Sequence, residues 1–344
     1  MSLVLNVLDQ SPVFAGQSPV VAVQNTVRLA CEAEKLGYRR FWVSEHHGSR
    51  AFGSASPEIL IARIASATSR IRVGAGGILL RHYQPLKVAE QFNLLEAMFP
   101  GRIDLGLGST TGAPPRVALA LRASRSSPPF EARIDELIGY LGPGAPDAFR
   151  AVPVVPAAPL PWVLGTSPAS ALLAAKRGLP FAVGQFLAPR NLDETIDTYH
   201  HAFEPSKWLE RPRVNLALFV ICADSEERAL TLGSPAEAWL VQSSLRKMNV
   251  PFPTTSEALA TANAAPGAHD GYDETELREI AARRSAVMAG TGRDIAKELR
   301  RRVAGGRVHE VTLVTIAEHF EDRLRSYQLV AEACGLAAPG GGAP

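Results

Sequence analysis

The sequence predicts an α/β fold in which eight parallel strands close into a (β/α)8 TIM barrel with two insertions. Segments with the composition of strands and of helices alternate along the chain, as in parallel sheets covered by helices. Glycine-rich stretches follow two strands, at 74–77 and 106–112, and ligands bind at the carboxyl ends of strands in such folds. One barrel with insertions also explains 344 residues better than two domains.

The first half of the barrel follows from short apolar runs and helical spacing. Val23, Val27 and Cys31 recur on one face of a helix that Gly37 ends. Pro85 suits the first turn of another helix, which ends at Pro100. The expected strands lie at 3–8, 40–44, 71–73 and 102–107, and the expected helices at 20–36, 57–67 and 85–98.

The second half is interrupted twice, which predicts two excursions over the mouth of the barrel, at about 113–159 and 233–275. Prolines punctuate the first, which contains one expected helix at 130–141; the second is expected to be irregular and a candidate mobile lid. Residues 1–336 are expected to form one barrel domain, and residues 337–344 a disordered tail. The remaining strands are expected at 161–164, 179–183, 213–222 and 309–314, and the remaining helices at 169–177, 192–203, from Ser225, and at 276–288, 293–303 and 318–334.

Composition argues against several classes of protein. The net charge of +2 gives no electrostatic reason to expect binding to nucleic acid or to an anionic membrane. Three widely separated cysteines, Cys31, Cys222 and Cys334, argue against a disulfide framework and indicate a reducing cytoplasm. The chain has no apolar run of membrane-spanning length, and its first residues lack the basic segment of a signal peptide. We therefore expect a cytoplasmic protein.

Glu45, His46 and His47 stand at the carboxyl end of the second expected strand. A histidine there is a candidate base or hydrogen-bond donor in the barrel mouth, and the alternative is a pair of loop histidines. The place at the end of a barrel strand favours the functional interpretation. No HExxH, HxH or CxxC spacing is present, so no metal site is predicted.

Two glycine-rich stretches are candidate contacts for a cofactor. The stretch 74–77 either lets a flat ring lie against the backbone or forms a tight barrel corner, and the sequence leaves both open. Gly106, Gly108 and Gly112 indicate a phosphate loop only weakly, because the dinucleotide fingerprint GxGxxG would need glycine at Thr111. We therefore reject a Rossmann fold.

The segment 165–170 (GTSPAS) is a better candidate for an anion site. It joins a strand to the start of a helix, where free backbone N–H groups and the helix dipole favour a phosphate. Thr166, Ser167 and Ser170 add three hydroxyl groups. The alternative is a plain serine N-cap, which is the safer interpretation of this segment by itself.

Together these motifs resemble the bacterial-luciferase-like flavin monooxygenases, and most of all the single-chain branch that includes antibiotic-tailoring oxygenases. The family fold is an eight-stranded barrel with a large insertion late in the chain. The resembling segments run from end to end in the order and spacing of the family: LDQSPV (8–13), GYRRFWVSEHH (37–47), SPEILIARIASATSRIRVGAGGILLRHYQPLKVAEQF (56–92), PGRIDLGLG (100–108), WVLGTSPASALLAAKRGLPFA (162–182) and RLRSYQLVAEA (323–333).

The resemblance implies that reduced FMN binds with its ring in the barrel mouth and its phosphate near the fifth strand. Ser167 and Ser170, with Thr166 beside them, fall where the phosphate-contacting hydroxyls of the family lie. Gly76–Gly77 falls where relatives have a non-proline cis peptide under the flavin ring. His46 matches the histidine near the reactive edge of the ring.

This chain departs from the family pattern at one cofactor position. Relatives commonly carry an arginine after the fourth strand that approaches the phosphate, and this chain has Ser109. Loss of a charge-assisted contact would cost about 1.5–3 kcal/mol, or roughly tenfold to hundredfold in FMN affinity. Arg81 and Arg116 are candidates to replace it. The segment 185–187 (QFL) also lacks a histidine that is common in close relatives.

The main hypothesis is a two-component, FMN-dependent monooxygenase with His46 as its catalytic residue. A separate flavin reductase would supply reduced FMN, because the chain has no nicotinamide-binding fingerprint of its own. Oxygen would add to the flavin, and the peroxyflavin would oxygenate a small organic substrate of secondary metabolism. The alternatives are a deazaflavin-dependent hydride-transfer oxidoreductase and a non-catalytic barrel, with or without flavin. The family also implies a homodimer formed through early helices.

Overall fold

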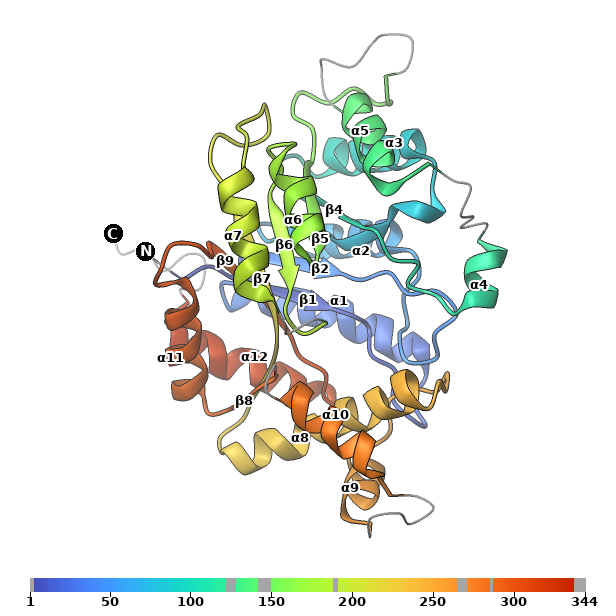
Figure 1. The fold of residues 1–344 in the computed structure, drawn as a ribbon, viewed down its shortest axis with the longest axis vertical. Coiled ribbons are helices and arrows are strands. Elements are labelled where there is room, and N and C mark those ends of the chain that lie inside the picture. The colour runs from blue at the N-terminus through green and yellow to red at the C-terminus, as the bar shows by residue number, and fades with distance from the viewer. Residues whose placement is uncertain are drawn as a thin grey trace.

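The computed structural model describes residues 3–121, 128–141, 150–187, 191–264, 271–284 and 287–336 (Figure 1). In these residues the strands are β1 (Leu5–Asp9), β2 (Arg40–Val43), β3 (Arg72–Leu79), β4 (Ile103–Gly108), β5 (Leu160–Gly165), β6 (Phe181–Gly184), β7 (Val214–Cys222), β8 (Val287–Gly290) and β9 (Glu310–Val314). The helices are α1 (Pro19–Lys35), α2 (Pro57–Ala67), α3 (Pro85–Met98), α4 (Pro115–Ala120), α5 (Phe130–Tyr140), α6 (Pro168–Ala175), α7 (Leu192–Ala202), α8 (Glu226–Leu240), α9 (Thr255–Asn263), α10 (Glu274–Arg284), α11 (Gly292–Val303) and α12 (Phe320–Cys334), with a 3-10 turn η1 (Leu80–His82) and a π-helical turn η3 (Val241–Leu245).

Eight parallel strands close into a barrel, which confirms the predicted TIM barrel. Strands β1 to β7 pair in chain order, β7 pairs with β9, and β9 returns to β1. The helices lie around this barrel (Figure 1). Strand β8 is an extra strand that pairs with the last residues of the long β7, Phe219 to Cys222, beyond those that pair with β6.

The main core lies between the outer face of the barrel and its helices. Leu29 of α1, Phe41 of β2 and Ile61 of α2 are fully buried there, together with Phe92 of α3 and Leu313 of β9. Each such side chain contributes about 1.5–3 kcal/mol through burial. This apolar layer fixes the strands and therefore the positions of the residues at their carboxyl ends.

The structure extends the third strand beyond its expected end. Strand β3 does not stop at Val73 but continues through the glycines to Leu79, with a register irregularity between Ala75 and Ile78. The glycines let β3 lie unusually close to β4, because a Cβ atom on Gly77 would lie 2.8 Å from the backbone of Gly106. The glycines were expected to end the strand, but in the structure they allow two strands to pack closely.

The prediction of an irregular excursion at 233–275 was wrong for much of that range. Helix α8 continues to Leu240 although it contains Pro235, which has no N–H to offer the carbonyl of Thr231. The hydroxyl of Ser234 donates to that carbonyl instead, at 2.9 Å. Helix α9 and the start of α10 follow, and these helices gather at the lower end of the molecule in Figure 1.

Smaller differences concern the ends of elements and the first excursion. The helix expected at 276–288 ends earlier, because Met288 pairs with Val220 in strand β8. Helix α5 lies where the first excursion was expected to be helical, and the short α4 was not predicted. The tail at 337–344 lies outside the described residues. Among the helices described, we find none with both the length and the apolarity to cross a membrane.

Candidate active site

A cavity of about 450 Å³ opens at the carboxyl ends of the barrel strands. Its volume lies in the range of small-molecule and cofactor sites. Its walls come from strands β1 to β7 and β9 and from the loops that follow several of them. All seven predicted site residues line it: His46, Gly76, Gly77, Ser109, Thr166, Ser167 and Ser170.

His46 is held on two sides at the edge of this cavity. Its ring stacks on Phe52 with 4.0 Å between ring centroids, and its Nδ1 lies 3.1 Å from the hydroxyl oxygen of Ser44. Burial, with a smaller effect of the neighbouring His47, lowers the pKa of His46 to about 4. The imidazole is therefore neutral at physiological pH and can accept or donate one proton at Nε2.

Glu45 and His47 are engaged in hydrogen bonds with each other and with neighbouring residues, which stabilise the wall of the cavity. The carboxylate of Glu45 is buried and accepts from the Tyr83 hydroxyl at 2.8 Å and from the Leu79 backbone N–H at 2.9 Å. The Nε2 atom of His47 lies 2.6 Å from the same carboxylate. Glu45 and His46 both line the cavity, but only His46 stacks its ring on Phe52.

The glycines of β3 form a part of the wall that a side chain would fill. A Cβ atom on Gly76 would lie 2.8 Å from Leu8 and 3.2 Å from Trp42, both of which line the cavity. The peptide bond between Gly76 and Gly77 is cis, as the family resemblance implied. Close packing at these glycines agrees with the interpretation as a tight barrel corner, and contact with a flat ring stays a prediction.

The segment after β5 forms a serine capping box at the start of α6. The backbone N–H of Ser170 donates to the Ser167 hydroxyl at 3.4 Å, and the Ser170 hydroxyl donates to the Ser167 carbonyl at 2.7 Å. The interpretation of this segment as a serine N-cap is therefore confirmed. Ser167 is exposed and Ser170 half-buried, and both, with Thr166, line the cavity. The capping box engages the backbone N–H groups of both serines, and the interpretation of this corner as an anion site stays a prediction.

No cation stands at this corner among the described residues that line the cavity. Ser109 lines it at the end of β4, but neither Arg81 nor Arg116 does, and both are exposed. The suggestion that one of them replaces the family arginine thus gains no support from the structure. An anion bound here would be held by hydroxyl groups and backbone N–H groups without a guanidinium.

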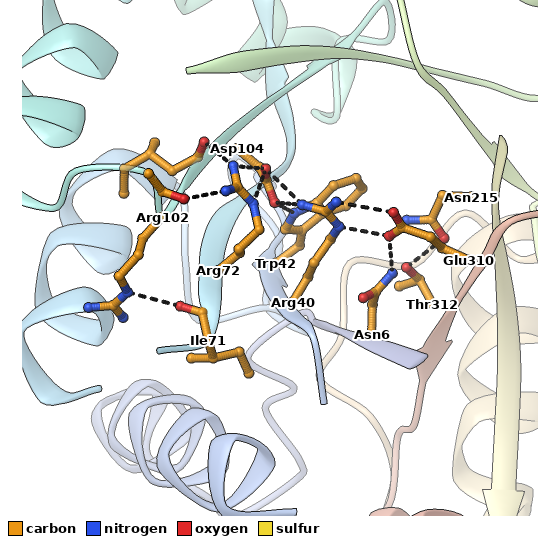
Figure 2. A network of polar contacts seen from close by, with 12 residues as sticks. Asn6, Arg40, Trp42, Ile71, Arg72, Arg102, Asp104, Asn215, Glu310 and Thr312 are labelled. Atoms are coloured by element: carbon orange, nitrogen blue, oxygen red, sulfur yellow. Dashed lines mark hydrogen bonds and ion pairs between the residues drawn. The ribbon is translucent and has the colours of Figure 1, made fainter. Parts of the chain in front are cut away.

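A network of buried charges joins β2, β4 and β9 (Figure 2). The guanidinium of Arg40 donates to both carboxylate oxygens of Asp104, at 3.0 and 2.8 Å, and to those of Glu310, at 2.7 and 3.1 Å. Burial alone would raise the pKa of Asp104, but Arg40 and Arg72 outweigh it and hold that pKa below its ordinary value. Trp42, which lines the cavity, donates to Asp104 at 3.0 Å.

Sequence reasoning missed the polar residues at the bottom of the cavity. Asn215 and Thr312 line it, together with Ala217, and they come from β7 and β9. Each is a polar residue inside a strongly apolar strand, RVNLALFVIC and EVTLV, and that contrast was the available signal. Phe186 and Leu187, from the segment that lacks the family histidine, also line the cavity.

In the described part of the chain, no group of three His, Cys, Asp or Glu side chains is arranged to hold a metal ion. The three cysteines are free thiols. The cavity instead offers a flat glycine wall, one neutral histidine and a hydroxyl-lined helix start. A parallel barrel with such a mouth belongs to the class of barrels whose ligand sites lie at the carboxyl ends of the strands.

Comparison with known proteins identifies the family. The model of luciferase-like monooxygenases matches residues 1–309. YwcH of Bacillus subtilis is 41% identical over 336 residues, covering 96% of this chain and 98% of the relative. The N-acetyl-S-alkylcysteine monooxygenase of the same organism is 33% identical over 341 residues, covering 96% and 97%. The chain belongs to the luciferase-like monooxygenase family, which confirms the resemblance and identifies an oxidoreductase.

Solved structures agree with this assignment. Apo-MsnO8 has a TM-score of 0.88 and 35% identity, and the match covers 98% of this chain and 99% of that one. Two more distant structures share the fold alone. They are the oxygenating constituent of the 3,6-diketocamphane monooxygenase of Pseudomonas putida with FMN (TM-score 0.69, 18% identity) and an F420-dependent secondary alcohol dehydrogenase (TM-score 0.61, 16% identity).

Proposed function

We propose that this protein is a flavin-dependent monooxygenase that uses reduced FMN and oxygen to oxygenate a small organic substrate. The observation that carries the proposal is the convergence of His46, the Gly76–Gly77 wall and the Ser167–Ser170 helix start on one cavity. Family membership supports oxygenation as the reaction class. FMN is favoured as the cofactor because one end of the cavity is a helix start suited to a phosphate.

The residues present fit the cofactor. The flat backbone of Gly76 and Gly77 suits one face of an isoalloxazine ring, and any side chain there would collide with Leu8 or with Gly106. Thr166, Ser167 and Ser170 would hold the phosphate. Reduced FMN, when bound, would supply the two electrons that activate oxygen.

His46 would act on a proton beside the reacting centre. With a pKa of about 4 it is neutral, so its Nε2 can donate or accept a hydrogen bond without a net charge in the pocket. Phe52 continues the aromatic wall from His46 to Trp239 and Phe252, with ring centroids 5.3 and 5.6 Å from its own. Packing of these rings against one another and against His46 would exclude water from that side of the imidazole.

The substrate class is open to a direct test, because one relative is an N-acetyl-S-alkylcysteine monooxygenase. We take thioethers of this kind as the first probe substrates and products of secondary metabolism as the wider class. Anaerobic protein with reduced FMN would be mixed with air, and absorbance followed with and without probe. A long-lived species distinct from oxidised and reduced FMN is expected. Immediate appearance of oxidised FMN at the protein-free rate would contradict the proposal.

Hydride transfer with a deazaflavin is the second candidate, supported by the fold likeness to an F420-dependent enzyme. Anaerobic turnover of a secondary alcohol with that cofactor, and no binding of FMN, would establish it instead. A barrel without activity would bind neither cofactor.

The remaining proposals concern partner proteins and the location of the protein in the cell. A separate reductase would deliver reduced FMN, and the three free cysteines agree with a cytoplasmic protein. We also propose a homodimer through α2 and α3, because they expose Ile59, Leu94 and Met98 at 69%, 51% and 50%. Exposed apolar side chains on two helices that contact each other are candidates for such an interface.

A further inference from the structure

The bottom of the cavity contains a buried amide without a complete set of partners. Asn215 on β7 is fully inaccessible to solvent, and Thr312 on β9 is nearly so. The Thr312 hydroxyl donates to the Asn215 Oδ1 atom at 2.9 Å. The Nδ2 atom of Asn215 has no hydrogen-bond partner among the described residues.

An unpaired buried donor is unfavourable, so a partner is expected. Several buried polar atoms in the described residues lack a protein partner, but of the residues that carry them only Asn215 lines the cavity. Its partner is therefore expected to come from whatever occupies the cavity.

Apolar side chains near the Asn215 amide limit the hydrogen-bonding groups that a ligand can meet there. Leu8, Trp42 and Ala182 line the cavity near the bottom of the barrel and form an apolar cluster. The Asp104 and Glu310 carboxylates accept from Arg40, and neither accepts from the Asn215 amide. In an otherwise apolar floor, one N–H group fixes the orientation of a ligand through a single acceptor.

We propose that the Nδ2 amide of Asn215 donates a hydrogen bond to a pyrimidine carbonyl of the flavin ring, with Thr312 holding the amide in that orientation. The inference rests on the proposed function for the identity of the ligand. The isoalloxazine system carries two carbonyl oxygens on its pyrimidine ring, and the chain that leads to the phosphate leaves from N10 of the central ring. A phosphate at the Ser167–Ser170 corner leaves the ring to reach into the barrel.

The redox state of the flavin gives the proposal a distinctive signature. Reduction places negative charge on the pyrimidine ring, and a hydrogen bond to a charged acceptor is stronger than one to a neutral acceptor. Asn215 therefore favours reduced over oxidised flavin. It is a positioning residue for the ring and determines which redox form binds more tightly.

The test is titration of apo-protein with oxidised FMN in air and with photoreduced FMN under anaerobic conditions. Asn215→Ala should weaken binding of oxidised FMN about two- to tenfold and of reduced FMN about tenfold to hundredfold. Asn215→Asp should weaken reduced FMN further, because a carboxylate would face the carbonyl. Thr312→Val should give a smaller loss in the same direction.

The control is Asn93→Ala, which removes another buried amide, one that donates to the Ala151 carbonyl away from the cavity. It should lower thermal stability and leave both FMN affinities unchanged. Wild-type affinities in Asn215→Ala, equal losses for both redox forms, or tighter binding by Asn215→Asp would overturn the inference. If Asn215→Ala does not fold, unchanged affinities in Thr312→Val overturn it. Failure of the wild-type protein to bind either form would instead reject the proposed function.

Discussion

The rings of His46 and Phe52 stack face to face, 4.0 Å apart at an interplanar angle of 22°. His46 follows β2, and Phe52 lies in the loop that precedes α2. Phe52 in turn contacts Trp239 of the late helical excursion, edge to face at 5.3 Å. The candidate proton-transfer residue is therefore held by a wall that includes α8, 193 positions further along the chain (239 − 46 = 193).

Replacement of His46 by alanine tests its proposed role. The variant should fold and bind FMN within about threefold of the wild type, but oxygenate a probe substrate roughly 10²- to 10⁴-fold more slowly, as expected for loss of a positioned acid or base. Product formation in single turnover is the measurement. His201→Ala, which alters an exposed histidine on α7, should retain the wild-type rate. Full activity in His46→Ala would remove His46 from the mechanism.

Acid should destabilise the protein through His46. The pKa of His46 is about 4 in the folded protein and near 6.5 in the unfolded chain. Below pH 6.5 the unfolded chain therefore binds a proton at this residue that the native state does not bind. Stability is complete above pH 6.5 and falls as the pH drops toward 4. The free energy of unfolding, measured by urea denaturation, should fall by about 1–2 kcal/mol more in the wild type than in His46→Gln across this window. Parallel curves for the two proteins would contradict this.

Introduction of the family arginine at Ser109 should strengthen cofactor binding. Ser109→Arg should tighten FMN binding about tenfold to hundredfold at low salt, because a guanidinium would reach the phosphate corner. The gain should shrink as salt is added. Ser109→Gln, which has length without charge, is the matched control for equilibrium titration. An affinity for FMN that does not change in Ser109→Arg would show that the phosphate lies elsewhere.

Removal of the central carboxylate should destabilise the barrel strongly. Asp104→Asn leaves the buried guanidinium of Arg40 with half of its partners and is expected to cost about 3–5 kcal/mol. Glu204→Gln is a fitting comparison, since it breaks an exposed pair with Lys176 and should cost less than about 1 kcal/mol. Denaturant unfolding of both variants measures the change in the free energy of unfolding. Similar small decreases in the two variants would mean that the buried network contributes little to stability.

The proposed dimer predicts a change in molecular mass. Ile59→Lys or Leu94→Lys should convert a dimer into a monomer, because each places a charge in an apolar contact between α2 and α3 surfaces. Analytical ultracentrifugation reports the mass directly. Leu119→Lys, which alters an exposed leucine on α4, should leave the dimer intact. Sedimentation of the wild-type protein as a monomer at micromolar concentration would refute this part of the proposal.

Much of the fold was available in the sequence because its signals are local. Pro57 and Pro85 begin the helices that they were expected to begin, and the apolar runs at 40–44 and 309–314 are strands. Where local signals conflicted with tertiary packing, the prediction was wrong. The glycines after Val73 lie within a strand because β4 approaches them closely, and Met288 pairs with an extension of β7.

The sequence by itself determined the alternation of strands and helices, and hence which residues stand at the carboxyl ends of the strands. It therefore placed His46, Ser109 and Ser167 at one rim. Only the tertiary structure decided what lies beneath that rim. Asn215 meets Thr312 across 97 positions, and Arg40 meets Glu310 across 270, because closure of the barrel brings β7, β9 and β2 around one axis. No periodicity within a single segment encodes such pairs, since their partners are set by how the whole sheet closes.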